Sequence, residues 1–165
     1  MLSGRATKLA SCFVGLDKRY VTDIDLTART TTGDPEGAVV ARAEPPSPAE
    51  LERRLEPLRG EAELPIPAAS AVKIGGERAY KLARRGVQVD MPVRRSRIDA
   101  LDVITYSEGE ARLDLRVSSG TYVRAVADAL GGHCRTLRRL EIGPFSVDEA
   151  DPDRFIAPED ALARL

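Results

Sequence analysis

Residues 111–130 read ARLDLRVSSGTYVRAVADAL, and their hydrophobic period changes in the middle. Apolar and polar residues alternate over 111–117, which is the pattern of a half-buried strand. Over 122–130 the apolar residues recur at the spacing of one helix face, and two glycines follow. We therefore predict a strand, a tight connection at Gly120 and a helix, with Thr121 as the candidate N-cap.

The flanking sequence predicts more strands than helices. Further strands are predicted over residues 20–26, 38–43 and 93–106, and helices over 49–58, 77–85 and 158–164. Residues 59–70 contain one glycine and two prolines, which predicts an irregular loop, and residues 135–142 fit either a helix or a strand. The predicted class is α+β, with a mixed, largely antiparallel sheet flanked by helices.

Composition indicates one soluble domain. The chain has 165 residues, of which 42% are hydrophobic and only 4% aromatic, so we expect an aliphatic core. Cys12 and Cys134 are far apart and neither lies in a Cys-x-x-Cys motif, which argues against a disulfide framework and a cysteine zinc site. No apolar stretch approaches the ~18 residues of a membrane helix, and the N-terminus lacks a hydrophobic signal core. We therefore expect a cytoplasmic protein without a membrane partner.

Charge is unevenly distributed along the chain. The formal net charge is −1, which excludes a uniformly basic nucleic-acid-binding protein. Residues 73–97 nevertheless carry eight basic and two acidic residues, whereas residues 141–160 carry one basic and seven acidic residues. This separation fits a polyanionic partner bound to one face, and it also fits solvated helix surfaces.

Two tyrosines lie beside basic residues at the ends of predicted elements. Tyr122 and Arg124 fall in the first turn of the predicted helix, where backbone N–H groups attract phosphate or carboxylate groups. The alternative is an ordinary capped helix. Tyr20 follows Lys18 and Arg19 at a strand start, where an aromatic ring can stack a splayed base while cations bind phosphates. The alternative is packing within the sheet.

The sequence offers few other groups for catalysis. His133 follows two glycines and has no paired Asp or Cys motif, so we expect it to form a hydrogen bond rather than to act as a general base. The sequence contains no metal-ligand spacing, phosphate-binding glycine loop or nucleophilic serine motif.

Seven short motifs follow one another along the chain. They are Gly4-Arg5-Ala6-Thr7-Lys8, Asp17-Lys18-Arg19-Tyr20, Thr30-x-x-Gly33-Asp34, Pro67-x-x-Ser70-Ala71-Val72-Lys73, Gly76-x-x-Ala79-Tyr80, Gly120-Thr121-Tyr122-Val123-Arg124 and Leu137-Arg138-Arg139-x-x-Ile142-Gly143-Pro144-Phe145. In this order they resemble the TruB-type tRNA pseudouridine synthases, which isomerise a uridine in the T-arm loop of tRNA, at position 55, to pseudouridine. The resemblance implies the catalytic fold of that family and an isomerase that uses no metal and no cofactor.

The resemblance also implies roles for individual residues. Tyr20 resembles the active-site tyrosine whose ring packs on the target base and whose hydroxyl is proposed to assist proton removal. Tyr122 resembles a tyrosine of the base pocket, and Leu137 an apolar residue of the same pocket. Arg124 resembles the arginine that pairs with the catalytic aspartate and would keep that carboxylate ionised and oriented.

The same resemblance implies how RNA is held. Within a catalytic domain of residues 1–165, the loop and helix at 59–86 resemble a thumb-like insertion that grips the RNA stem-loop. The basic residues expected to contact RNA are Lys18, Arg19, Lys73, Arg78, Lys81, Arg84 and Arg85. The implied partner is the T-arm stem-loop of tRNA, not DNA, and the implied protein is a monomer.

One part of the family's pattern is not found in the sequence. The nucleophilic aspartate of the family lies in a Gly-x-Leu-Asp-Pro motif shortly upstream of the segment that begins at Gly4, and Met1 stands three residues before Gly4. The pairs Asp34-Pro35 and Asp151-Pro152 occupy other places in the order. We therefore expect a catalytic domain that lacks its N-terminal part. The alternatives are a catalytically inactive RNA-binding remnant and a fragment destabilised by an exposed sheet edge.

Overall fold

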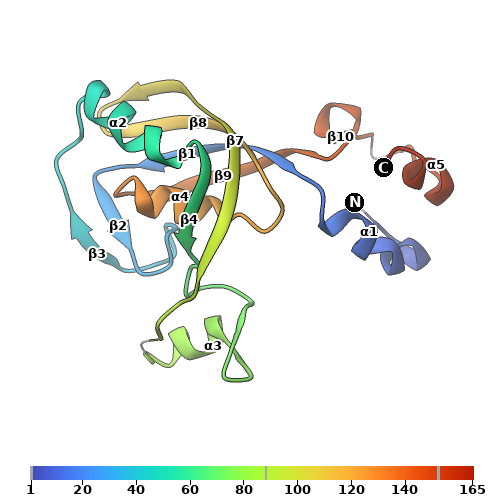
Figure 1. The fold of residues 1–165 in the computed structure, drawn as a ribbon, viewed down its shortest axis with the longest axis horizontal. Coiled ribbons are helices and arrows are strands. Elements are labelled where there is room, and N and C mark those ends of the chain that lie inside the picture. The colour runs from blue at the N-terminus through green and yellow to red at the C-terminus, as the bar shows by residue number, and fades with distance from the viewer. Residues whose placement is uncertain (1, 88, 152) are drawn as a thin grey trace.

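A six-stranded sheet forms the centre of the fold, with its strands in the order β10-β9-β1-β8-β7-β4 (Figure 1). The structure is a computed structural model that describes residues 2–87, 89–151 and 153–165, so Met1, Gln88 and Pro152 lie outside the described residues. The six strands are β1 (Lys18–Asp25), β4 (Gly60–Pro65), β7 (Val93–Ser107), β8 (Glu110–Val117), β9 (His133–Ile142) and β10 (Phe145–Ser146). Every neighbouring pair is antiparallel, which confirms the predicted class.

Two short hairpins accompany the main sheet. They are β2 (Ala28–Thr30) with β3 (Val39–Arg42), and β5 (Lys73–Ile74) with β6 (Glu77–Arg78). The strands predicted over 20–26, 38–43 and 93–106 are therefore confirmed. The turn between β7 and β8 holds Glu108 and Gly109 at positive φ (51° and 84°), as a tight two-residue hairpin turn requires.

The helices are short. They are η1 (Gly4–Leu9), α1 (Ala10–Val14), α2 (Pro48–Leu55), η2 (Glu56–Leu58), α3 (Ala79–Arg84), α4 (Val123–Ala129), η3 (Val147–Glu149) and α5 (Pro158–Leu162). Helix α2 begins after Ser47, whose side chain accepts a hydrogen bond from the Glu50 N–H (3.2 Å). No helix in the described part of the chain is long and apolar enough to cross a membrane.

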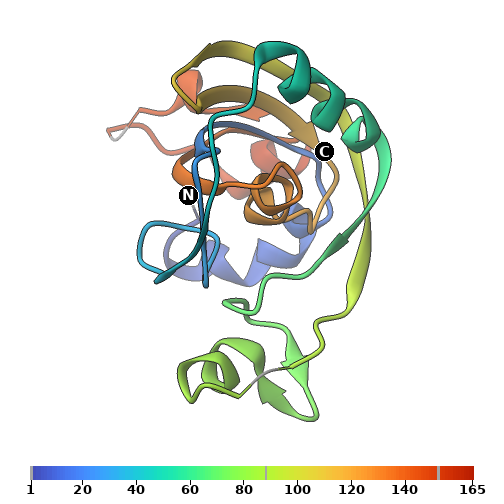
Figure 2. The same ribbon diagram turned by 90° about the vertical axis from the view of Figure 1, so that its left-hand side faces the viewer.

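The core lies between the helices α2 and α4 and one face of the sheet, called the inner face from here on. Thr22 and Ile24 of β1 are fully buried on this face, as is Leu113 of β8 opposite Thr22. Leu55 of α2 and Val126 of α4 belong to the same apolar cluster. Figure 2 shows α4 in the hollow of the curved sheet. The alternating pattern of 111–117 therefore places every second side chain of β8 against α4.

The outer face of the sheet carries ion pairs instead. Arg19 of β1 pairs with Asp114 of β8 (N–O 2.7 Å) and with Glu141 of β9 (3.0 Å). Three further pairs of this region are Arg116–Glu141, Arg112–Asp23 and Arg135–Glu110. Because such exposed pairs contribute only about 0–1 kcal/mol each, their main consequence is that these cations are already neutralised.

Two predictions about local structure are wrong. Residues 60–65 are not loop but the edge strand β4, because Ala62 and Leu64 bury their side chains in the core, and an edge strand tolerates a proline at its end. Thr121 is not the N-cap of α4. Tyr122 occupies that position with extended backbone, and the Thr121 hydroxyl lies 3.3 Å from that of Ser118. Residues 135–142, which fit either state, lie in strand β9.

Residues 66–87 project from the sheet as a separate lobe, called the thumb from here on (Figures 1 and 2). The thumb contains β5, β6 and α3. Helix α3 ends at Arg84, and Gly86 follows two residues later with a positive φ of 72° and a hydrogen bond from its N–H to the Ala83 carbonyl (3.0 Å), as is common after a helix C-terminus. The projecting part begins later than the expected residue 59, because β4 belongs to the sheet.

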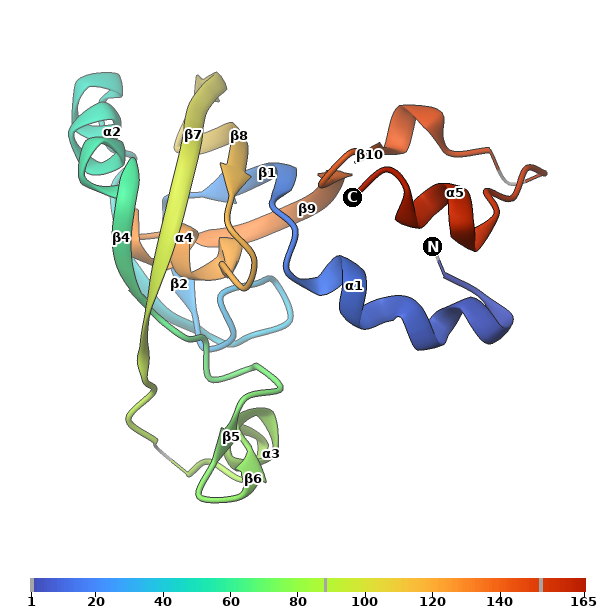
Figure 3. The same ribbon diagram turned by 45° about the vertical axis from the view of Figure 1, so that its right-hand side comes forward.

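The two terminal segments lie on the same side of the molecule, beyond the ends of β1 and β9 (Figure 3). The rings of Phe13 and Phe145 pack edge to face, 5.7 Å apart. The Arg164 guanidinium lies 4.5 Å from the centre of the Phe145 ring. The chain ends thus extend away from α4 and leave the inner face to the thumb and the β2–β3 hairpin.

The packing makes a quantitative prediction for stability. Leu113→Ala should lower the free energy of unfolding by about 2–5 kcal/mol, because it opens a cavity between β8 and the helices. Ile104→Ala on β7, where the side chain is 49% exposed, should change the same quantity by less than about 0.5 kcal/mol. Urea unfolding followed by circular dichroism measures both values. Equal losses in the two variants would contradict this assignment of the core.

Candidate functional site

Tyr20 lies on the inner face near the end of the sheet where α4 begins. It stands directly opposite Leu115 of β8 and Arg139 of β9. Directly opposite residues of antiparallel strands share a face, and Tyr20 alternates with the core residue Thr22. Leu137 lies opposite Thr22, and its side chain is half exposed. The structure therefore brings Tyr20 and Leu137 together as diagonal neighbours on one surface, with the Tyr20 ring packed against the core.

Tyr122 reaches the same region from the start of α4. It is half-buried and packs against the same core cluster as Tyr20. The loop before it is fixed to β7, because the Ser118 N–H donates to the Arg97 carbonyl (2.8 Å) and the Ser118 hydroxyl accepts from the Arg97 N–H (3.0 Å). Gly120 allows the turn, with a φ of 83°.

Lys18 connects the start of β1 to that loop. Its Nζ donates to the carbonyls of Val14 (2.7 Å) and Leu16 (2.6 Å) and to the hydroxyl of Ser119 (3.1 Å). Three acceptors match the three donors of an ammonium group. Burial, and after it the positive charge of Arg139, hold the pKa of Lys18 below its usual value, although Asp17 opposes the shift. An RNA phosphate would have to displace one of these partners, so RNA binding by Lys18 stays a prediction.

Arg124 joins three segments of the chain. Its Nη1 donates to the Asp34 carboxylate (2.8 Å) and to the Thr32 carbonyl (3.1 Å), and its Nη2 donates to the Ala69 carbonyl at the base of the thumb (2.9 Å). Gly33 makes this approach possible, because a Cβ at its position would lie 3.3 Å from the Arg124 Cβ. Arg124 is thus paired with a carboxylate of this chain, and its pairing with a catalytic aspartate stays a prediction.

The sequence analysis missed Asp34 as a site residue. Asp34 was considered only as part of the pair Asp34-Pro35, which does not stand where the family's nucleophile stands. It also belongs to the motif Thr30-x-x-Gly33-Asp34. The signal that could have found it is the threonine-rich turn. Thr30 donates to the Asp34 carbonyl (2.7 Å), and Thr32 bonds its carboxylate. Asp128, one turn after Arg124 on α4, pairs instead with Arg29 (2.6 Å).

Arg19 is not brought together with Tyr20. Its side chain lies on the outer face, and hydrogen bonds to Asp114 and then to Glu141 raise its pKa. The alternation of a strand makes this unavoidable, because adjacent residues point to opposite faces. A role of Arg19 in RNA binding stays a prediction, and any RNA bound there would be on the far side of the sheet from Tyr20.

The thumb places most of its basic residues in solvent. Lys73, Arg78, Lys81 and Arg84 form no ion pair with any described residue, and Arg85 pairs with Glu77 (2.7 Å). The thumb is anchored by bonds from the Ala79 N–H to the Val72 carbonyl (2.7 Å) and from the Tyr80 N–H to the Ser70 carbonyl (3.0 Å). Its base meets the site directly, because Arg124 binds Ala69.

His133 lies away from this surface and is buried. Its Nδ1 lies 2.8 Å from the Ala28 carbonyl, which fits the expected hydrogen-bonding role and ties β9 to β2. Among the residues that the structure describes, no group of three His, Cys, Asp or Glu side chains is placed to hold a metal ion.

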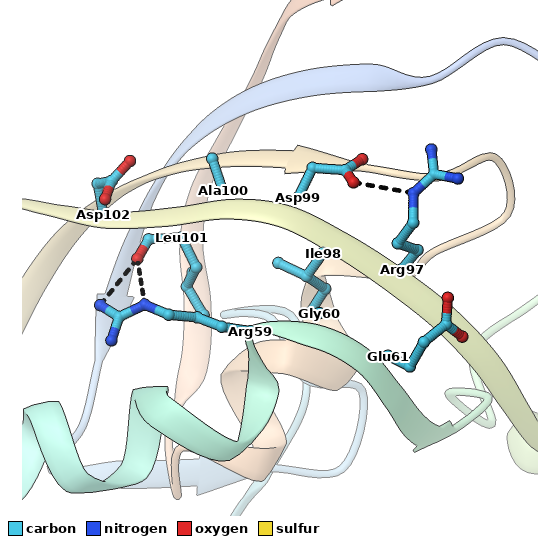
Figure 4. A pocket seen from close by; sticks show the side chains of 9 residues that line it. All are labelled: Arg59, Gly60, Glu61, Arg97, Ile98, Asp99, Ala100, Leu101 and Asp102. Atoms are coloured by element: carbon cyan, nitrogen blue, oxygen red, sulfur yellow. Dashed lines mark hydrogen bonds and ion pairs between the residues drawn. The ribbon is translucent and has the colours of Figure 1, made fainter.

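An open hollow of about 450 Å³ lies along β4 and β7 (Figure 4). Figure 4 shows Arg59 reaching the Leu101 carbonyl at one end and an Arg97–Asp99 pair at the other. Its lining contains none of the predicted site residues. The hollow is therefore separate from the surface around Tyr20, and its two arginines, Arg59 and Arg97, are already paired with carboxylates of the protein.

The sequence of the chain is similar to those of known proteins of one family. The model of the "TruB family pseudouridylate synthase (N terminal domain)" matches residues 1–123. A tRNA pseudouridine synthase B of Mycobacterium sp. (strain KMS) is 40% identical over 171 residues, which cover 96% of this chain and 58% of that protein. The protein of the same name from Rhodopirellula baltica is 36% identical over 170 residues, which cover 98% of this chain and 49% of that protein. The chain thus spans about half the length of these curated relatives.

Solved structures show the same fold. A Cbf5-Nop10-Gar1 complex contains a chain that matches with a TM-score of 0.60 and 21% identity, over 87% of this chain and 36% of that one. An H/ACA RNP bound to a substrate RNA containing 2'-deoxyuridine matches with a TM-score of 0.57 and 17% identity, over 87% of this chain and 34% of that one. With the family model matching residues 1–123 and the relatives aligned over nearly the whole chain, this chain belongs to the TruB family of pseudouridylate synthases.

Proposed function

We propose that this chain contributes the uridine-binding part of a tRNA pseudouridine synthase that acts at position 55 in the T-arm loop. The observation that carries the proposal is that Tyr20 and Leu137 are diagonal neighbours on the inner face, while Tyr122, two residues before Arg124 at the start of α4, packs against the same core cluster as Tyr20. These are the residues that the family resemblance assigns to the base pocket and the catalytic arginine, and they come from three separate parts of the sequence.

The surface can hold a uridine that has left its stack. Extrusion of a base from a folded loop costs a few kcal/mol, and the flipped base is then accessible at its glycosidic bond. Tyr20 offers an aromatic face and Leu137 an apolar contact beside it, so stacking can offset that cost. The exposed cations of the thumb can bind phosphates of the stem at the same time.

The reaction is an isomerisation in which atoms and charges balance within the substrate. The C1′–N1 bond breaks with help from a carboxylate at the sugar, the uracil rotates, and a C1′–C5 bond forms. C5 then loses its proton, and N1 gains one. The Tyr20 hydroxyl is the group we assign to the C5 proton, because its ring lies where the base would stack.

Arg124 would hold the attacking carboxylate. A guanidinium has five donors, and three are used by Asp34, Thr32 and Ala69. The remaining two can bind a second carboxylate as a fork, and the arginine's charge would keep that group ionised. Because Asp34 and two carbonyls fix its orientation, Arg124 needs no rearrangement to present these donors.

A second candidate function is RNA binding without chemistry. It is favoured by the Arg124–Asp34 pair, since this ion pair already satisfies the charge of the arginine within the chain. The exposed thumb cations would serve such a protein equally well. The two candidates make the same prediction for RNA affinity and differ in turnover.

Base stacking on Tyr20 can be tested by affinity. Tyr20→Ala should weaken binding of a T-arm stem-loop about tenfold, because a stacked base contributes about 1–3 kcal/mol. A stem-loop without a base at position 55 should bind the wild-type protein about tenfold more weakly than the intact stem-loop does. The Tyr20→Ala protein should bind the intact and the abasic stem-loop with equal affinity. Fluorescence anisotropy measures these affinities, with Tyr80→Ala in the thumb as a control that still discriminates. A Tyr20→Ala protein that discriminates as the wild type does would remove Tyr20 from the base site.

The thumb can be tested by its electrostatics. Replacing Lys81, Arg84 and Arg85 together by Glu should weaken stem-loop binding and reduce the slope of log K against log salt by about 2–3, if each cation neutralises one phosphate. A control variant carries the same change of net charge on α2 and the outer face, at Arg53, Arg112 and Arg135. An unchanged slope in the thumb variant, or the same change in both, would exclude the thumb from the interface.

Turnover tests whether this chain carries a nucleophile of its own. We expect purified residues 1–165 to release no tritium from a T-arm RNA labelled at C5 of uridine. The reason is that the Gly-x-Leu-Asp-Pro motif, in which the family's nucleophilic aspartate lies, is not found among these residues. Multiple turnovers would show that one of this chain's own carboxylates acts as the nucleophile, with Asp34→Asn as the first variant to examine.

A further inference from the structure

We propose that Arg139 binds a backbone phosphate of the nucleotide whose base stacks on Tyr20. This inference rests on the proposed function and adds a residue to it. Arg139 would fix the position of the target nucleotide at its phosphate, while Tyr20 and Leu137 receive its base.

A bulge in β9 places Arg139 on the inner face. Arg19 of β1 lies opposite Glu141, and the next residue, Tyr20, lies opposite Arg139, so Leu140 is an extra residue in β9. Without this shift Arg139 would share the outer face with Glu141, because alternate residues of a regular strand point the same way. Bulges commonly serve to re-aim a side chain beside a functional site. Here the bulge sets a cation directly beside Tyr20.

Arg139 lacks the carboxylate partners that most arginines of the outer face have. On that face Arg19, Arg112 and Arg116 all pair with carboxylates of neighbouring strands. Arg139 is exposed and forms no ion pair with any described residue. Its charged neighbour on the inner face is Lys18, another cation, whose pKa is lowered first by burial and then by Arg139.

Two neighbouring cations favour an anion at this place, because Asp17, the carboxylate that acts on Lys18, is already paired with Arg97 (2.8 Å). Lys18 uses its three donors within the protein, so the guanidinium of Arg139 is the group with free donors. A planar guanidinium binds a phosphate through two parallel hydrogen bonds. In a nucleotide a single sugar separates the phosphate from the base. Arg139 and Tyr20 are likewise close neighbours, because they stand directly opposite each other on adjacent strands. The chemistry that fits both groups at once is a single ribonucleotide.

Arg138 supplies a matched control. It is also exposed and forms no ion pair with any described residue, but it lies opposite Val21 and therefore on the outer face. Arg138→Gln and Arg139→Gln remove the same charge from adjacent positions of one strand. A general electrostatic effect would change RNA binding equally in both, whereas contact with the target nucleotide would change it only in Arg139→Gln.

The experiment combines these variants with RNAs in which one phosphate is neutral. T-arm stem-loops carry a methylphosphonate linkage on either the 5′ or the 3′ side of position 55. For the wild-type protein and Arg138→Gln, one of the two linkages should weaken binding about tenfold, as expected for loss of a charged hydrogen bond. Arg139→Gln should bind the unmodified RNA about tenfold more weakly and should not be weakened further by that linkage.

The outcomes are distinguishable. If the wild-type protein shows no salt-dependent binding of the stem-loop, the proposed function fails. If it binds but Arg139→Gln and Arg138→Gln behave alike, or if Arg139→Gln stays fully sensitive to both linkages, the assignment of Arg139 is wrong while the proposed function stands. Both arginines are exposed, so circular dichroism should show an unchanged fold in either variant.

Discussion

Strand β1 is hydrogen-bonded on both sides, to β8 and to β9, and this double pairing decides the direction of each side chain near the site. Thr22 and Ile24 must enter the core, so Tyr20 joins them on the inner face and Arg19 is directed to the outer face. A slip by one residue would exchange the two faces and expose the core residues. The position of the aromatic ring is therefore fixed by the burial of two residues further along the same strand.

A second constraint links the site to the thumb. Arg124 is held by Asp34 from the loop after β2 and by the Ala69 carbonyl at the base of the thumb. A displacement of the thumb would therefore change the hydrogen bonds of Arg124, which we propose to hold the catalytic carboxylate. In the proposed function, RNA bound by the thumb cations would therefore be connected to Arg124 through one carbonyl group. The arrangement explains why a lobe outside the sheet can bear on a group at the start of α4.

Sequence analysis could predict the features that depend on local periodicity. The strand at 111–117 and the helix after Gly120 follow from spacing, and motif matching named Tyr20, Tyr122, Arg124 and Leu137. What it could not predict depends on contacts between distant segments. Residues 60–65 form a strand because they pair with β7 at the edge of the sheet. The glycine and the proline in this segment predict a loop instead. Asp34 becomes a site residue only because the fold brings it to Arg124, 90 positions further along the chain.

The distribution of paired and unpaired cations explains how a chain with a net charge of −1 can still offer a surface to RNA. On the outer face carboxylates stand opposite arginines, and the charges cancel over single ion-pair distances. On the inner side Arg139 and the thumb residues Lys81 and Arg84 have no such partners among the described residues. Since the Debye length at physiological salt is only about 8 Å, a polyanion responds to the local pairing and not to the sum over the molecule. Seven of the 26 acidic residues are gathered in residues 141–160, and the part of this segment after β10 lies beyond the end of the sheet (Figure 3), so it does not neutralise the thumb cations locally.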